Sequence, residues 1–434
     1  MLYGLPVKVL PCGHLANLGS RRLCRHLFGE RADELDKVWV LRGVGVDYDL
    51  CCADCARDGR PELADACEGC TARAGDDRLS VVGVIGEPEI RRRPEPVNTR
   101  LRRSPLPAAL LDAAPLASCP GQWLLLTREH LIRWHAGTGE VTGRWKITLP
   151  GTGPERKAGS AARYRLHAAP GGECAAVVVD YRQHGMVVDL AGGRTTMILD
   201  RGGYRVEQTP FPAAFTAVDG QVLLVHATAW NRVDLSDPVT GTLLTPRAFP
   251  AEAGRRFPPH YLGYFYGTLL PSPDGSQIVS DGWVWAPVGV PRAWAIRPWR
   301  HEYAYEPEDG DSVRGVRQVS YYWDKPMCWA GDTRLALGGI GADSQAMIPG
   351  VEIYDVTTGA LAAAFAGPDG DLHCDGDQLY AAGPGGMTIW DIRTGETTGT
   401  VPGFAPTRYH AGSHELAAID DTAMVIWPTR PDGT

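Results

Sequence analysis

From about residue 80 to its end the chain repeats one local pattern, and this repeat limits the fold more than any other feature. Short apolar strands alternate with turns that contain Thr-Gly or Gly, as in LIRWHAGTGE, EIYDVTTGAL and TIWDIRTGET. Turns of this kind join neighbouring antiparallel strands closely. Seven anchors mark the repeat: Trp134, Val188, Val233, Trp285, Tyr354, Trp390 and Trp427.

The spacing of the anchors is typical of propeller blades. The gaps run from 36 to 69 residues with a mean of about 49, and four-stranded blades repeat every ~40 to 50 residues. No long amphipathic helical pattern interrupts the series, which disfavours a parallel α/β sheet. The sequence therefore predicts an all-β fold with a seven-bladed β-propeller over residues 79–434.

Two of the repeats carry a family resemblance. Tyr354-Asp355 with Thr358-Gly359, and Trp390-Asp391 with Thr394-Gly395, resemble the Trp-Asp dipeptide and following turn of WD-repeat propellers. The segment PSPDGSQIVSDGWVW is similar to one common in bacterial members. The resemblance covers roughly residues 80 to 430, and it implies a propeller that serves as a protein-interaction scaffold.

The end of the repeat predicts how the ring closes. Only seven residues, rich in Pro and Gly, follow Trp427, too few for a good outer strand, and an unpaired sheet edge would be left exposed. Residues 79–90, LSVVGVIGEPEI, are the best strand candidate before blade one. We therefore predict that 79–90 closes blade seven and that 91–115, which begins with the arginine-rich RRRPEPVNTRLRRSP, links it to blade one.

Cysteine and histidine crowd the first 70 residues. Cys52-x2-Cys55 and Cys67-x2-Cys70 are two knuckles whose thiolates complete a tetrahedral zinc site. Cys12-x-His14 and Cys24-x-His26 offer a second quartet of zinc donors. The pairing is either sequential or interleaved, as in RING-type cross-braces, and Cys51 is a ninth candidate.

These spacings predict a module at residues 1–78 that resembles a zinc ribbon or treble clef. It holds one zinc ion at the four cysteines, with a second at the upstream quartet. A catalytic zinc keeps an open position, whereas here every knuckle has a partner. We interpret the metal as structural, because zinc binding supplies folding energy to domains this small.

Composition bears on where the protein works. Pro6, Lys8 and Pro11 interrupt the apolar N-terminus before a signal-peptide core forms, and no run approaches the ~18 apolar residues of a membrane span. The sequence favours a cytoplasmic protein without a membrane segment. Only five of 43 basic residues are lysines, which indicates a GC-rich bacterial genome.

Charge is distributed unevenly along the chain. Residues 1–103 carry 17 basic and 16 acidic residues, and the remainder carries 26 and 35. Because nucleic-acid binding depends on basic surface, the acidic body disfavours a general nucleic-acid binder. A reader that combines the zinc module with the arginines from Arg91 to Arg103 stays an alternative.

Aromatic residues gather in one region. Residues 257–329 contain 15 of the 36 aromatics, and Trp and Tyr are favoured anchors of protein interfaces. The predicted partner face consists of Tyr264, Tyr266, Trp283, Trp285, Trp299 and Trp323.

No catalytic signature accompanies these features. The chain has neither a Gly-x-Ser-x-Gly elbow nor a phosphate loop ending in Gly-Lys. The sequence therefore favours a non-catalytic scaffold that holds protein partners on its blades and zinc module. The enzyme alternative requires His, Asp and Glu converging at the ring axis, or an open zinc position.

Overall fold

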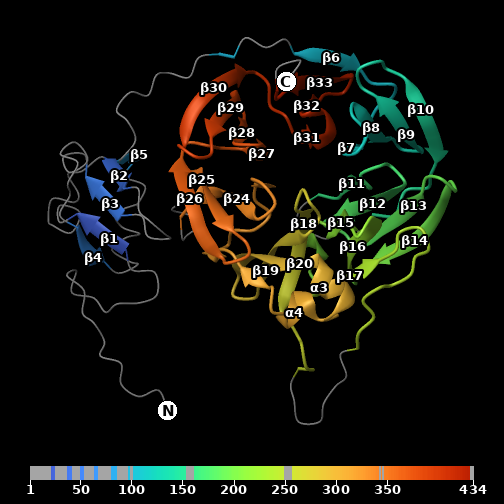
Figure 1. Ribbon diagram of the computed structural model, residues 1–434, viewed down its shortest axis with the longest axis horizontal. Coiled ribbons are helices and arrows are strands. Elements are labelled where there is room, and N and C mark those ends of the chain that lie inside the picture. Colours follow the sequence, from blue (N-terminus) through green and yellow to red (C-terminus); the bar gives the residue numbers. More distant parts are fainter. Residues whose placement is uncertain are drawn as a thin grey trace.

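Residues 102–428 form a ring of seven β-sheets around a central axis (Figure 1). The computed structural model describes residues 96–97, 101–152, 161–248, 257–341, 344 and 347–430, together with the backbone of five strands nearer the N-terminus. Each ring sheet is one blade, and its strands follow one another antiparallel from the axis outward. The predicted all-β, seven-bladed propeller is confirmed.

The first three blades follow directly in sequence. Blade one contains β7 (Asp112–Pro115), β8 (Gln122–Leu126), β9 (His130–His135) and β10 (Val141–Lys146). Blade two contains β11 (Arg163–Ala168), β12 (Cys174–Asp180), β13 (His184–Asp189) and β14 (Arg194–Asp200). Blade three contains β15 (Ala213–Val218), β16 (Gln221–Ala229) and β17 (Arg232–Ser236).

The last four blades complete the ring. Blade four contains β18 (Tyr264–Pro271), β19 (Gln277–Val284), β20 (Val288–Ala295) and the short β21 (Arg314–Gly315) and β22 (Val319–Ser320). Blade five contains β23 (Met327–Trp329), β24 (Arg334–Ile340), β25 (Ile348–Asp355) and β26 (Ala360–Ala366). Blade six contains β27 (Asp371–Asp375), β28 (Gln378–Gly383), β29 (Gly386–Asp391) and β30 (Glu396–Pro402). Blade seven contains β31 (Arg408–His410), β32 (Glu415–Ile419), β33 (Ala423–Pro428) and β6 (Arg102–Pro105).

Apolar side chains of neighbouring blades pack face to face and hold the ring together. Leu124 and Leu131 of blade one share a buried cluster with Val177 and Val188 of blade two. Every residue of β12 is buried, whereas β10 at the rim alternates between exposed and half-buried residues. Burial on both faces explains the continuous apolar run of the middle strands.

The Thr-Gly turns between third and outer strands have a common hydrogen-bond pattern. Asp355 Oδ1 accepts the backbone N–H groups of Thr357 and Thr358, at 2.9 and 3.2 Å. The glycine that ends this turn, Gly359, has φ of 74°, which other residues adopt only at a cost. An aspartate that caps the turn and a glycine that ends it explain why the repeat can be recognised in the sequence.

Blades three and four depart from the four-strand pattern. Within the described residues, blade three has no fourth strand, and its edge makes only the isolated bridge from Ser236 to Leu243. Blade four carries two helices between its third and outer strands, α3 (Ile296–His301) and α4 (Glu306–Asp309). Six of the seven predicted anchors lie on the third strands of their blades. The seventh, Trp285, lies in the turn before β20. The tryptophan on β20 itself, the third strand of blade four, is Trp294.

A strand from before blade one closes the ring, but it is β6 and not residues 79–90. Met424 of β33 pairs with Ser104 of β6. Residues 91–115, predicted as a linker into blade one, therefore contain the closing strand β6 and the first strand of blade one, β7. Arg102 contacts Glu415 and Arg103 contacts Asp420, each at 2.8 Å. This outer strand is exposed except at Ser104, so it lacks the apolar run that marks the middle strands.

The predicted closing segment belongs to a different sheet. Its strand β5 (Ser80–Ile85) pairs in parallel with β2 (Lys37–Leu41). The strands β1 (Arg21–Cys24), β3 (Asp49–Cys52) and β4 (Leu63–Ala66) complete this sheet in the order β4-β1-β3-β2-β5. The assignment of 79–90 to the propeller is therefore wrong.

Helices contribute little to the described part of the chain. None of them is long and apolar enough to cross a membrane.

Candidate interaction face

Blades three to five present a group of aromatic side chains on one face of the ring. Because strands alternate in direction, the turn between second and third strands lies on the same face as the connection to the next blade. Trp230 and Trp285 lie in the former kind of turn, and Tyr204 and Trp323 lie in the latter kind of connection. We define the aromatic face as the following residues: Tyr204, Trp230, Phe265, Trp283, Trp285 and Trp323.

The rings of the aromatic face stack in a continuous series. Phe265 and Trp283 are 4.1 Å apart between centroids with an interplanar angle of 7°. Trp283 continues the stack to Trp323 at 5.0 Å, and Phe265 continues it to Trp230 at 4.5 Å. Offset contacts of this kind contribute about 0.5–1.5 kcal/mol each beyond burial. The series fixes the positions of its members before any partner arrives.

Two residues of the aromatic face are widely exposed. Trp285 is 63% exposed and Tyr204 is 52% exposed, whereas Phe265 and Trp283 beneath them are buried. The guanidinium carbon of Arg205 lies 5.3 Å from the centre of the Trp285 ring, a cation–π arrangement. The surface therefore presents two large rings on a rigid aromatic base.

The predicted partner face is only partly at the surface. Tyr264, Tyr266 and Trp299 are core residues, each at most 1% exposed, and their placement on a partner face is wrong. The Tyr264 hydroxyl donates to Val290 O at 2.8 Å, and Trp299 Nε1 donates to Ala304 O at 3.1 Å. These internal acceptors allow the polar ends of the rings to be buried.

The remaining predicted residues, Trp283, Trp285 and Trp323, belong to the aromatic face. Trp323 is half-buried, and its Nε1 donates to Gln208 O at 3.1 Å. Sequence reasoning missed Tyr204 and Trp230 because they precede the aromatic-rich window. A search for aromatics in equivalent turns of successive blades would have found both.

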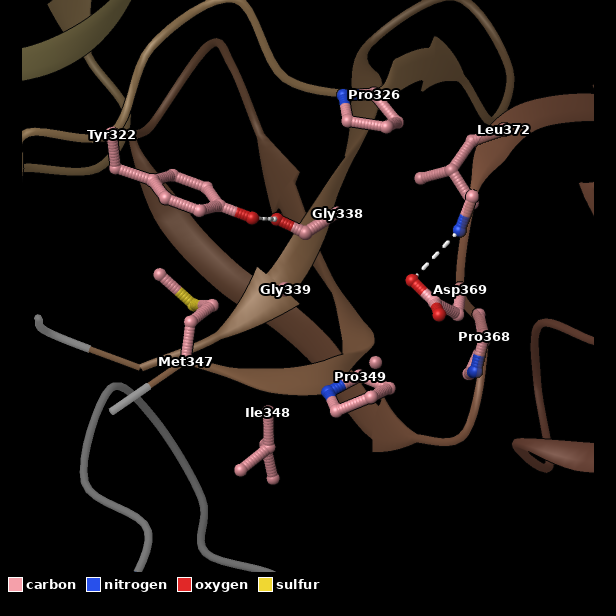
Figure 2. A pocket seen from close by; sticks show the side chains of 12 residues that line it. Tyr322, Pro326, Gly338, Gly339, Met347, Ile348, Pro349, Pro368, Asp369 and Leu372 are labelled. Atoms are coloured by element: carbon pink, nitrogen blue, oxygen red, sulfur yellow. Dashed lines mark hydrogen bonds between the residues drawn. The ribbon is translucent and has the colours of Figure 1, made fainter. Parts of the chain in front are cut away.

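A small cavity adjoins the aromatic face between blades five and six (Figure 2). It measures about 230 Å³, and its lining includes Tyr322, Met347, Pro349 and Asp369. Tyr322 precedes Trp323, so one connection contributes to both features. The Tyr322 hydroxyl donates to Gly338 O at 3.1 Å, which fixes the ring at the edge of the cavity.

The eight predicted zinc ligands are not described at the level of side chains. Six of them lie outside the described residues: Cys12, His14, His26, Cys55, Cys67 and Cys70. The ninth candidate, Cys51, lies in β3, but its side chain is not described. Only the backbone positions of Cys24 and Cys52 are given, as the last residues of β1 and β3. In the ranges with described side chains, no group of three or more His, Cys, Asp and Glu is arranged to hold a metal ion.

Comparison with known proteins finds similar solved structures. No family model matches the chain, and no curated protein matches it. Among solved structures the fold is similar to a chain of "Kuenenia stuttgartiensis Hydrazine Synthase", with 13% sequence identity and a TM-score of 0.49. The match covers 79% of this chain and 99% of the other. The seven-bladed assignment rests on the strand pairing described above.

Proposed function

We propose that this protein is a non-catalytic scaffold that holds a protein partner on the aromatic face. The observation that carries the proposal is the exposure of Trp285 and Tyr204 on a stacked base. Exposed aromatic patches on a folded surface mark interaction sites. Rigid rings also lose little conformational freedom on binding, which favours affinity.

The WD-repeat resemblance supports the same function by analogy. The Asp-capped Thr-Gly turns at Asp355 and Asp391 follow the pattern that suggested it. Membership of that family, a bacterial source and a cytoplasmic location are part of the proposal. Fold alone does not fix function, so the argument depends on the aromatic face.

We further propose that the N-terminal sheet carries structural zinc with interleaved ligand pairs. β1 and β3 are parallel neighbours in which Leu23 pairs with Leu50, so Cys24 and Cys52 end at the same edge. Ala66, which precedes Cys67, pairs with Arg21 at the opposite edge. This register favours one zinc ion shared by Cys24, His26, Cys52 and Cys55, rather than the sequential arrangement of the ligands.

A capture experiment with matched variants tests the scaffold. The full chain, a Trp285→Ala/Tyr204→Ala variant and an Ile198→Ala control are used to capture partners from the native host. Ile198 is 75% exposed on β14, the outer strand of blade two, and is not a member of the aromatic face. We expect a partner whose recovery falls about tenfold or more with the double variant alone. Equal recovery by all three proteins would contradict the proposal.

A further inference from the structure

A larger cavity lies along the axis of the ring. It measures about 480 Å³ and is lined by the inner strands β7, β11, β15 and β18, with Arg408 of β31. A volume of this size is within the range of small-molecule sites. The inner strands of four blades and one residue of a fifth therefore enclose room for a ligand.

The walls of this axial cavity are mainly apolar. Pro115, Phe211, Phe215 and Leu269 line it, and the last three are buried. Among the described residues that line it, the charged ones are Arg165, Arg408 and Asp180. The lining thus combines an apolar body with an excess of one positive charge.

Each of the two arginines has N–H groups that donate no hydrogen bond to a described residue. Arg165 donates from Nε to Asp180 Oδ2 at 3.1 Å, and its terminal nitrogens have no hydrogen bond to a described residue. Arg408 donates from Nε to Ala113 O at 3.0 Å and from its terminal nitrogens to Thr407 O and to Asp112. A guanidinium has five N–H groups, so both side chains have donors left.

Asp112 brings the two arginines to the same part of the cavity. One of its oxygens accepts from Arg408, and the other accepts the backbone N–H of Leu166 at 2.8 Å. Leu166 lies between Arg165 and His167 on β11. The carboxylate therefore links Arg408 to the strand that carries Arg165.

His167 adds an uncharged donor to this group. Its Nε2 is buried and has no hydrogen-bond partner among the described residues. Burial, reinforced by the positive charge of Arg165, lowers the pKa of His167 to about 4, so the ring is neutral at pH 7. A neutral imidazole donates from one nitrogen, and a ligand acceptor would satisfy Nε2.

The carboxylate in the lining is already occupied. Asp180 Oδ1 accepts the backbone N–H of Phe211 at 3.1 Å. Its Oδ2 contacts Arg165 at 3.1 Å and Arg163 at 3.3 Å. A cationic ligand would have to compete with these partners, whereas an anion would meet unused donors.

We propose that the axial cavity binds a small organic carboxylate with an apolar body. The carboxylate group accepts hydrogen bonds from Arg165, Arg408 and His167, and the body packs against Phe211, Phe215 and Leu269. Arginine favours carboxylates because its paired N–H groups match their geometry. This site is separate from the aromatic face and does not depend on the scaffold proposal.

Titration calorimetry on the full chain tests the site with three probes that share one ring. We expect benzoate to bind saturably, and benzyl alcohol and benzylamine not to bind. Arg165→Gln and Arg408→Gln should each weaken benzoate binding by about tenfold or more. Arg334→Gln is the matched control, because Arg334 is exposed on blade five.

A second variant protects the test against misfolding. Ala117 is exposed and lines the cavity, so Ala117→Phe narrows the space and retains every charge. It should also weaken benzoate binding. The proposal is overturned if benzoate gives no saturable binding up to about 10 mM, or if all variants bind it as the wild type does.

Discussion

Replacing Arg247 with methionine would test the buried ion network at the edge of blade three. The side chains of Arg247, Asp234 and Glu308 are 1%, 0% and 2% exposed. Arg247 contacts Asp234, and its Nη2 donates to Glu308 Oε1 at 2.6 Å and to Val233 O at 2.8 Å. Methionine fills much of the same space but leaves Glu308 buried without this cation.

The expected loss of stability follows from burial and pH. Removing one partner of a buried pair costs about 3–5 kcal/mol. Burial raises the pKa of Glu308 from 4.5 to about 7, although Arg247 lowers it. Without Arg247 the pKa rises further. The folded state then holds a proton that the unfolded state releases, and stability falls as pH rises from 4.5 to the folded pKa. In the wild type the unfolding free energy stops falling near pH 7, the folded pKa of Glu308. In the variant it continues to fall above pH 7, because its folded pKa is higher. The difference in unfolding free energy between the two proteins therefore grows by about 1.4 kcal/mol per pH unit above pH 7.

Urea denaturation followed by circular dichroism at about pH 6 and pH 8 measures this penalty. We expect Arg247→Met to be destabilised at both values and more strongly at pH 8. Combining it with Glu308→Gln should remove the extra loss at pH 8, and exposed Arg334→Met should have little effect. A loss below about 1 kcal/mol, or an equal loss at both pH values, would refute the reasoning.

Three further predictions concern ring closure, a buried carboxyl group and zinc. Ser104 is buried, and its hydroxyl donates to Ala136 O at 2.6 Å, so Ser104→Ala should lower the unfolding free energy by about 1 kcal/mol; an unchanged urea midpoint would argue against closure by β6. Asp281 is buried, accepts the Lys325 N–H at 2.8 Å, and burial raises its pKa from 3.8 to about 7. The wild type therefore loses up to roughly 4 kcal/mol between these pH values, and Asp281→Asn should become more stable relative to it as pH rises; denaturation curves with a constant difference would contradict this. Replacing Cys24 and Cys52 together by serine should remove one of two zinc ions in native mass spectrometry if the pairs interleave, and both ions if they are sequential.

The sequence predicts the propeller because its turns have a local physical cause. The aspartate cap and the glycine with positive φ at Asp355 and Gly359 act within five residues. The pattern is therefore visible in a short stretch of sequence. The apolar middle strands are equally local, since both of their faces are buried between blades. Fold class and blade number follow from these two signals.

The closing strand and the burial of individual aromatics depend on contacts distant in sequence. Arg103 of β6 meets Asp420 more than 300 residues later, and no local pattern marks such a strand. Likewise Tyr264 and Trp285 are both aromatic residues in blade four, but one is a core residue and the other is at the surface. Only the turn position of Trp285 separates them.

The axial cavity could not be predicted from the sequence, because it also depends on contacts between residues distant in sequence. Its charged residues, Arg165, Asp180 and Arg408, come from blades two and seven, and each resembles an ordinary strand residue. Their convergence is a product of ring closure. The alternative of His and Asp converging at the axis therefore gains a concrete location, which we interpret as a binding site.

Site-specific photocrosslinking tests the scaffold account most directly. A benzoylphenylalanine placed at position 285 in the full chain, within the native host, samples what touches the aromatic face, and the same group at position 198 samples an exposed site on blade two. The account predicts a discrete protein adduct from position 285 that is absent from position 198 and weakened by Tyr204→Ala. No adduct from position 285, or the same adducts from both positions, would contradict it.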